Sequence, residues 1–222
     1  MVAKSTWDAI MDAPEVIMGK QTGLGFTLDP RHLGFVLARY KFVAKMASSG
    51  GFKKAVEVGC GDAFPTAVVA QVVDTIHAVD IEQRTLDKRA KNPVLDAKVT
   101  FAVHDILAEP VPGGPYELAY SMDVVEHIPP EHDDGYYKNI ARSLGKRSMA
   151  IVGTPNKTAE AYQSEHSRIG HINLKTHDAL RADMSRYFEY VLMFGINDEI
   201  VHTGFPQMCH YLLAVGLHPK AA

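Results

Sequence analysis

The stretch Val56-Glu57-Val58-Gly59-Cys60-Gly61-Asp62-Ala63-Phe64 decides the fold, because in it an apolar strand runs through two glycines into a helix. Glycine lets the backbone turn sharply and approach a ligand closely, although a tight turn alone would also explain a lone Gly-x-Gly. The dinucleotide fingerprint needs a third glycine where this chain has Phe64. The Glu57 carboxylate would also repel a pyrophosphate and tolerate a cationic ligand. The stretch therefore favours a zwitterionic nucleoside over a dinucleotide.

Two further acids follow neighbouring strands of the expected sheet. Asp80 ends the strand expected at 75–79, and Asp105 follows the strand expected at 99–103. An acid at the tip of the second strand can accept hydrogen bonds from both ribose hydroxyls, and Ile81 beside it offers an apolar face to a base. The carboxylate of Asp105 can accept a hydrogen bond from an exocyclic amine such as adenine N6. Each acid alone is typical of a solvated turn, but together with Glu57 they predict a nucleoside site on one edge of the sheet.

The rest of the chain alternates short apolar runs with helical patterns, which predicts an α/β fold with a mostly parallel sheet covered by helices on both faces. A long helix is expected to begin at Pro30, with Asp29 as its cap, and to end at Gly50-Gly51. Segment 154–173 is polar and irregular, which is typical of a functional loop. Strands are expected at 54–58, 75–79, 99–103, 117–121 and 148–152, and helices at 66–73, 82–91, 130–144 and 176–187. The last two strands, 188–194 and 208–215, are expected to form an antiparallel hairpin around the loop 195–207.

Composition narrows the class of protein. The 222 residues carry 23 Lys+Arg against 26 Asp+Glu, a net charge of −3, which argues against a nucleic-acid partner. The two cysteines are too few for a disulfide framework, and no apolar run is long enough for a bilayer, so we expect no membrane partner and a cytoplasmic location. We predict a single domain over 1–222, with an N-terminal lid and helix (1–50), a cofactor-binding core (51–153) and an acceptor-side loop, helix and hairpin (154–222).

In these motifs the chain resembles the class I S-adenosylmethionine-dependent methyltransferases. The resemblance rests on Glu57-Val-Gly59-Cys-Gly61, Asp80, Asp105 and the segment Tyr116-Glu-Leu-Ala-Tyr-Ser-Met-Asp-Val-Val-Glu-His-Ile-Pro129. It implies a Rossmann-like sheet of seven strands with the last one antiparallel, and S-adenosyl-L-methionine as cofactor. Ala63 departs from the family by replacing a glycine common in its loop. The cofactor-binding residues expected on these grounds are Glu57, Gly59, Cys60, Gly61, Asp80, Ile81, Asp105, Ile106 and Met122.

The chemistry of the acceptor side is expected from histidines. Asp123, Glu126 and His127 stand at i, i+3 and i+4, which places them on one face if a helical turn begins there, and they are ligand types that bind Mg²⁺ or Mn²⁺. Together with His171, they resemble the metal ligands of small-RNA 2′-O-methyltransferases, except that Asp123 replaces a glutamate. The same pattern resembles quinone-biosynthesis O-methyltransferases. Without a metal, His171 or His127 would act as general base, and His202 is a further candidate contact to the acceptor.

These observations predict an enzyme that methylates a hydroxyl of a small molecule or sugar-like metabolite with S-adenosyl-L-methionine. The alternatives are a small-RNA 2′-O-methyltransferase, an N-methyltransferase of small molecules, an NAD-dependent oxidoreductase and a cofactor-binding protein without catalysis. The N-terminal residues Trp7, Met11 and Met18 are candidates for a lid over the site. The oligomeric state is left open.

Overall fold

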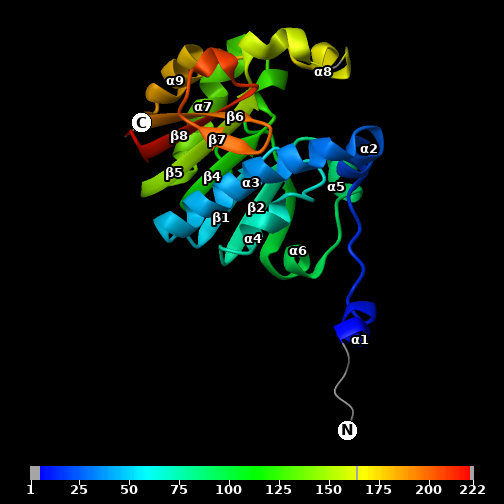
Figure 1. Cartoon of the computed structure of the whole chain (residues 1–222). Coiled ribbons are helices and arrows are strands. Elements are labelled where there is room, and N and C mark those ends of the chain that lie inside the picture. The colour runs from blue at the N-terminus through cyan, green and yellow to red at the C-terminus, as the bar shows by residue number, and fades with distance from the viewer. Residues whose placement is uncertain (1–5, 164, 221–222) are drawn as a thin grey trace.

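One mixed sheet flanked by helices forms the body of the molecule (Figure 1). The computed structural model describes residues 6–163 and 165–220. The strands are β1 (Lys54–Val58), β2 (Thr75–Asp80), β3 (Val99–Val103), β4 (Tyr116–Met122), β5 (Leu144–Pro155), β6 (Phe188–Asn197), β7 (Ile200–His202) and β8 (Tyr211–Pro219). The α-helices are α1 (Thr6–Met11), α2 (Lys20–Leu28), α3 (Pro30–Gly50), α4 (Thr66–Ala70), α5 (Gln83–Asp87), α6 (Pro93–Lys98), α7 (Asp133–Arg142), α8 (Glu165–Gly170) and α9 (His177–Ser185). Short 3₁₀ helices are η1 (Val125–His127), η2 (Pro130–His132), η3 (Lys157–Tyr162) and η4 (Pro206–Met208).

The strand order is β3-β2-β1-β4-β5-β8-β6-β7, and β1 to β5 run parallel. Strand β8 lies between β5 and β6 and is antiparallel to both. The predicted α/β class and antiparallel last strand are thereby confirmed. Because β1 pairs with both β2 and β4, the chain reverses its direction of winding there, and a crevice opens at the carboxyl ends of these strands.

The sheet has eight strands where the resemblance implied seven. The extra strand, β7, lies inside the predicted loop 195–207 and pairs with the end of β6. Asp198 adopts a left-handed backbone with φ of 51°, which lets the chain reverse between the two strands. Helix α6 was also missed, although the Asn92 side chain caps it by accepting from the backbone N–H groups of Val94 and Leu95. The helix expected at 82–91 is shorter, since α5 spans only Gln83–Asp87.

The long helix α3 begins and ends as its sequence predicts. Asp29 accepts from the backbone N–H of Arg31, and Gly51 ends the helix in the left-handed conformation with φ of 67°. Its inner face buries Tyr40, Val43 and Ala47, which anchors the helix across the sheet near the crevice. No helix in the described parts of the chain is long and apolar enough to cross a membrane.

Candidate active site

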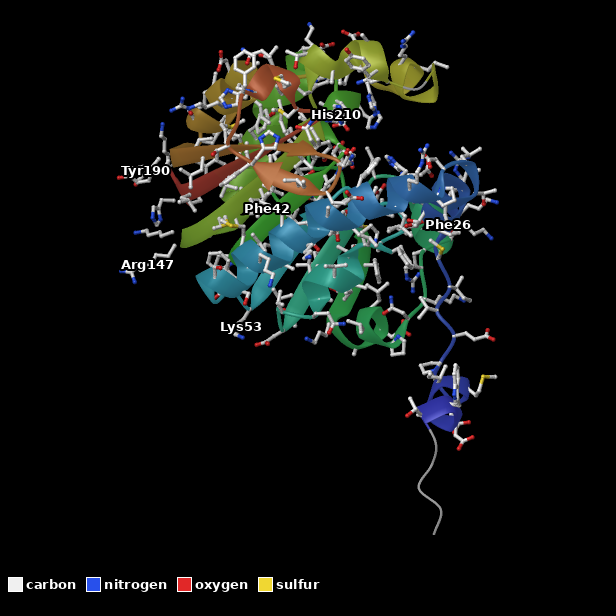
Figure 2. All side chains as sticks on the ribbon, viewed as in Figure 1. Phe26, Phe42, Lys53, Arg147, Tyr190 and His210 are labelled. Atoms are coloured by element: carbon white, nitrogen blue, oxygen red, sulfur yellow. The ribbon has the colours of Figure 1, made fainter. Side chains whose placement is uncertain are left out.

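A cavity of about 890 Å³ opens at the carboxyl ends of the central strands, which is large enough for a nucleoside cofactor together with a small acceptor. Its walls come from the sheet edge, from α2 and α3, and from the segment 154–173. Phe26 of α2 stands on the side of the molecule where this helix lies over the strand ends (Figure 2). Of the expected cofactor-binding residues, Gly59, Cys60, Gly61, Asp80, Ile81, Asp105, Ile106 and Met122 line the cavity.

Both glycines of the β1 turn have a backbone conformation that favours glycine. Gly59 and Gly61 have φ of +74° and +54°, a region that favours glycine. A Cβ on Gly59 would lie 2.2 Å from Cγ2 of Val124, and one on Gly61 would lie 2.6 Å from Oε1 of Gln21. Ala63 also has a positive φ, 57°, so the residue that departs from the family pattern keeps a glycine-like backbone. The turn therefore presents bare backbone to the cavity.

The carboxylate of Asp80 is held by two backbone N–H groups. Its Oδ2 accepts from Gly61 at 2.8 Å, and its Oδ1 accepts from Glu82 at 2.9 Å. Each carboxylate oxygen keeps a further lone pair for a ligand hydroxyl. Asp105 is exposed and accepts from the backbone N–H of Leu107 at 2.9 Å, while Ile81 is 67% exposed at the cavity wall. The carboxyl edge of the sheet thus offers two carboxylate acceptors, Asp80 and Asp105, and the apolar surface of Ile81.

Glu57 does not line this cavity, which corrects the expectation that it contacts the cofactor. It is 1% exposed and accepts hydrogen bonds from the hydroxyls of Tyr40 (2.8 Å), Thr66 (2.6 Å) and Tyr120 (2.9 Å). Burial raises the pKa of its carboxyl group to about 7. Glu57 stands two positions before Gly59, and its side chain points into the packed face of the sheet. It therefore lies behind the glycine turn and ties β1 to α3, α4 and β4.

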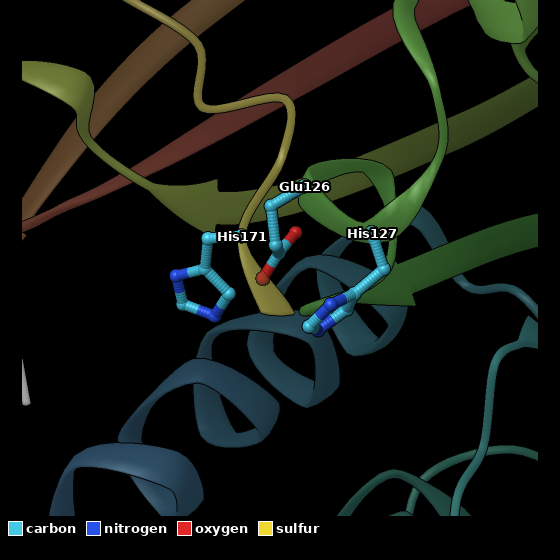
Figure 3. Close-up of side chains that lie close together, drawn as sticks. All are labelled: Glu126, His127 and His171. Carbon is cyan, nitrogen blue, oxygen red and sulfur yellow. The ribbon is translucent and has the colours of Figure 1, made fainter. Parts of the chain in front are cut away.

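Glu126, His127 and His171 converge on the other half of the site (Figure 3). Each can offer one ligand atom, and these atoms lie within 4.8 Å of one another. Glu126 is fully buried; its Oε2 accepts from the Thr154 hydroxyl at 2.9 Å, whereas Oε1 has no partner in the structure. Burial, with Asp123 nearby, raises the pKa of Glu126.

The two histidines of this cluster both suit proton transfer or metal ligation. His127 donates from Nδ1 to the backbone carbonyl of Gly170 at 2.8 Å, so Nε2 carries the lone pair when the ring is neutral. Nδ1 of His171 is buried without a partner. Burial and the neighbouring His127 lower the pKa of His171, which favours the neutral form of its ring.

Asp123 does not join this cluster. The helical turn that was expected to bring it onto one face with Glu126 and His127 starts only at Val125, and Asp123 has a left-handed φ of 58°. Its carboxylate lies 2.6 Å from Nη1 of Arg39, whose guanidinium stacks 3.8 Å above the ring of Tyr211. Asp123 and Arg39 therefore form a largely buried ion pair in the cavity wall.

His202 is not among the residues lining the cavity, which corrects its assignment as an acceptor contact. In β7, its Nε2 donates to Asn197 at 2.7 Å and its Nδ1 accepts from the backbone N–H of Gly204 at 3.0 Å. Both ring nitrogens are engaged in holding the β6–β7 turn. The predicted loop is a paired strand here, and pairing turns the imidazole toward its own hairpin.

The N-terminal cover is built by α2 and not by Trp7, Met11 or Met18, none of which lines the cavity. The backbone N–H and hydroxyl of Thr22 donate to the buried carboxylate of Asp62 at 2.6 and 2.8 Å, which fixes the start of α2 on the glycine turn. Sequence reasoning also missed several wall residues that it had no local signal to find. These are Gln21, Phe26, His32, Arg39 and Gln163.

Comparisons with known proteins agree with this geometry. The model of a family described as "Methyltransferase domain" matches residues 55–147, which include the glycine turn, Asp80, Asp105 and the Glu126-His127 pair. A "Ubiquinone biosynthesis O-methyltransferase" of Caulobacter sp. (strain K31) is 26% identical over 110 residues, covering 48% of this chain. The matched region spans 42% of the length of that curated relative.

Solved structures share the fold at low sequence identity. The methyltransferase domain of bacterial CtHen1-C superposes with a TM-score of 0.68 at 16% identity, covering 83% of this chain and 98% of that one. A TehB-like S-adenosylmethionine-dependent methyltransferase from Corynebacterium glutamicum gives 0.61 at 15% identity, covering 82% and 87%. The N-methyltransferase NodS from Bradyrhizobium japonicum gives 0.58 at 15% identity, covering 86% and 87%. Residues 55–147, which carry the glycine turn and the central strands, are therefore a methyltransferase domain with the class I fold, and its cosubstrate is S-adenosyl-L-methionine.

Proposed function

We propose that the protein transfers the methyl group of S-adenosyl-L-methionine to a hydroxyl group of a small molecule. The observation that carries this proposal is the cluster of Glu126, His127 and His171: the two histidines line the same cavity as the glycine turn, and the buried Glu126 lies beside them, outside the cavity lining. Two buried atoms of this cluster, Glu126 Oε1 and His171 Nδ1, have no hydrogen-bond partner in the structure. A buried polar atom without a partner costs free energy unless a bound ligand supplies the missing hydrogen bond or coordination.

The cofactor half of the cavity provides one contact for each part of the cosubstrate. In this proposal the glycine turn lies against the methionyl end, Asp80 accepts from the ribose hydroxyls, and Asp105 accepts from adenine N6 with Ile81 and Ile106 along the ring. Arg39 is the only Lys or Arg among the described residues that line the cavity. It is paired with Asp123 through Nη1, and its other N–H groups are the ones that would donate to the α-carboxylate. Helix α2 covers the bound cosubstrate and excludes water.

The reaction itself is a displacement at the methyl carbon. The acceptor oxygen forms a bond to that carbon, the carbon–sulfur bond breaks, and its electron pair returns to sulfur to leave S-adenosylhomocysteine. The hydroxyl proton passes to the neutral imidazole of His171 or to Nε2 of His127. Holding the two reactants in line in one cavity supplies much of the acceleration.

The same three residues fit a divalent cation. Two imidazole nitrogens and one carboxylate oxygen form a donor set that Mn²⁺ accepts, and Mg²⁺ with water in the remaining positions. When bound, such an ion lowers the pKa of an acceptor hydroxyl that it contacts. Glu126 with its free Oε1, His127 through Nε2 and His171 would hold it, while Asp123 is already paired with Arg39.

The walls of the cavity favour a compact, partly apolar acceptor. Near α2 and α3 they consist of Phe26, Leu28, Leu33 and Val36, surfaces that match a ring better than a chain of phosphates. The terminal ribose of an RNA is the second candidate, because the fold is similar to that of a solved small RNA methyltransferase, HEN1. The net charge of −3 opposes it, since RNA binding relies on neutralising phosphates.

The test combines metal binding with product formation. Free Mn²⁺ is followed by electron paramagnetic resonance as the protein is titrated with and without S-adenosylhomocysteine, and S-adenosylhomocysteine production is measured with catechols, ribonucleosides and a short RNA duplex. We expect one Mn²⁺ per chain, lost in Glu126→Gln and His171→Ala, and turnover with a small-molecule hydroxyl. Full activity after chelation would remove the metal from the proposal, and turnover with RNA alone would overturn the acceptor class.

A further inference from the structure

The N-terminal arm, residues 6–18, carries an apolar helix face that its own body does not cover. Helix α1 has no buried residue, and Figure 1 shows it lying away from the sheet and the other helices. Trp7, Ile10 and Met11 stand at i, i+3 and i+4, so they share one face, and they are 73%, 54% and 80% exposed. Three large apolar side chains on one short helix are typical anchors for a groove.

A groove of suitable chemistry lies between α3 and β7. It encloses about 410 Å³ and has an apolar floor of Leu37, Phe42 and Val201. Phe42 of α3, labelled in Figure 2, packs there against Phe194 of β6, with ring centroids 5.1 Å apart. Lys41 and Lys45, one helical turn apart and exposed, border this floor and form no ion pair within residues 6–163 and 165–220.

Charge complements the apolar match. The arm contains Asp8, Asp12 and Glu15 and no Lys, Arg or His between residues 6 and 18. The groove presents Lys41 and Lys45, with Glu199 as its single acid. Opposite charges around an apolar centre fix the register of a docked segment and speed its association.

The arm and the groove of one chain lie apart in the structure. The arm joins the body at Ile17, whose backbone N–H donates to Lys91 at 3.0 Å between α5 and α6, and both of these helices contact the edge strand β3. The groove lies between β7 and α3, which supplies six of the eight lining residues and contacts α4 and β4. Figure 1 shows α1 extending away from both α3 and β7, so the arm does not occupy the groove of its own chain in the structure.

We propose that the arm docks into the groove of a second copy of this chain, and that the second copy returns its own arm, giving a two-fold symmetric dimer. Trp7 fills the apolar floor between Leu37, Phe42 and Val201, and the acids of the arm pair with Lys41 and Lys45. Because each chain gives its arm and receives the arm of the other, the two arm–groove contacts are equivalent and the assembly stops at two chains.

Trp7 is the only tryptophan of the chain and reports its own burial. We expect light scattering to give twice the 24.4 kDa mass at high concentration and a single mass on dilution. Over the same range, the tryptophan emission should move to longer wavelength and become more accessible to acrylamide. A monomer with exposed Trp7 at all concentrations would overturn the proposal. So would a monomer with buried Trp7, which would mean that the arm docks on its own body, or a dimer in which Trp7 stays exposed.

Charge reversal tests the partner directly. The groove variant Lys41→Glu/Lys45→Glu and the arm variant Asp8→Lys/Asp12→Lys/Glu15→Lys should each raise the dimer dissociation constant at least tenfold. Mixed together, they should restore a heterodimer, since each chain then offers the arm that its partner's groove accepts. The matched control Lys146→Glu/Arg147→Glu, also exposed but outside the groove, should dimerise like the parent chain. Failure of the mixture to recover, or an equal loss in the control, would overturn the assigned contact.

Discussion

The two halves of the active-site cavity differ in how their polar groups are satisfied. On the cofactor side, both oxygens of Asp80 already accept backbone N–H groups, and Glu57 behind the turn accepts three hydroxyls. On the acceptor side, Glu126 Oε1, His171 Nδ1 and both amide atoms of Gln163 are buried without a partner in the structure. The protein therefore completes the cofactor half with its own backbone and leaves the acceptor half to be completed by ligands.

The largest effect should come from removing an unpartnered acceptor-side group. In His171→Ala, we expect kcat to fall by about 100-fold or more, because general-base catalysis contributes on the order of 10²–10⁴. The dissociation constant of S-adenosylhomocysteine, measured by calorimetry, should stay within about threefold, since His171 belongs to the other half. An unchanged kcat would remove His171 from the chemistry, and a large loss of cofactor affinity would mean that the two halves are not separate.

The next effect is the pH dependence of the free energy of unfolding, which we expect Glu57, behind the cofactor half, to change. Because burial raises the pKa of Glu57 to about 7, the folded state retains a proton that the unfolded state releases near pH 4.5. The free energy of unfolding should therefore fall as pH rises from about 5 to 8, by about 2.5 kcal/mol from this group.

Urea unfolding of the parent and of Glu57→Gln at pH 5 and pH 8 checks this prediction. The amide does not ionise, so the variant should lack this part of the pH dependence, and the difference between the two proteins isolates Glu57 from the histidines. Parallel pH profiles would show that the three hydroxyls hold an ionised carboxylate at both pH values.

A smaller effect is expected at the ribose contact. Asp80→Asn replaces a carboxylate that accepts from two backbone N–H groups with an amide that accepts at one oxygen only. We expect S-adenosylhomocysteine to bind roughly 10-fold more weakly, the loss of a hydrogen bond to a charged group. Asp105→Asn, in which only one carboxylate oxygen is bonded in the structure, is the matched comparison and should change affinity less. Equal losses in both variants would contradict the role given to Asp80.

The smallest effect has the opposite sign. Gln163→Leu removes two buried polar atoms that have no partner, so the unliganded protein should gain about 1 kcal/mol in unfolding free energy. Thermal and urea unfolding would measure this gain, with Gln83→Leu on the exposed face of α5 as control. A loss of stability in Gln163→Leu would show that the acceptor half is satisfied after all.

The sequence correctly predicted those strands and helix ends that depend on neighbouring residues. The apolar runs of β1 and β3, the Asp29 and Gly51 ends of α3, and the Thr176 cap of α9 were all predicted from neighbouring residues, and the structure confirms them. Contacts between side chains that are far apart in the sequence could not be predicted in this way. Arg39 reaches Asp123 from 84 positions away, and the side chain that was expected on a helical face is turned aside by one positive φ.

The same limit explains the two corrected site residues. Glu57 looked like a cofactor contact because it precedes the glycines, but three hydroxyls from distant elements enclose it. His202 looked like a loop histidine because β7 is too short to show an alternating pattern. In contrast, the placement of Asp80 and Asp105 at one sheet edge followed from parallel strand order alone.

The central claim is that one cavity holds the cosubstrate against Asp80 and the reacting hydroxyl against Glu126, His127 and His171. A crystal structure with S-adenosylhomocysteine and Mn²⁺, recorded with anomalous scattering at the manganese edge, tests it most directly. We predict ribose hydroxyls on the Asp80 carboxylate, the sulfur directed at the cluster, and one anomalous peak between Glu126, His127 and His171. A cofactor sulfur directed away from these three residues would contradict the account, whether or not a metal is found.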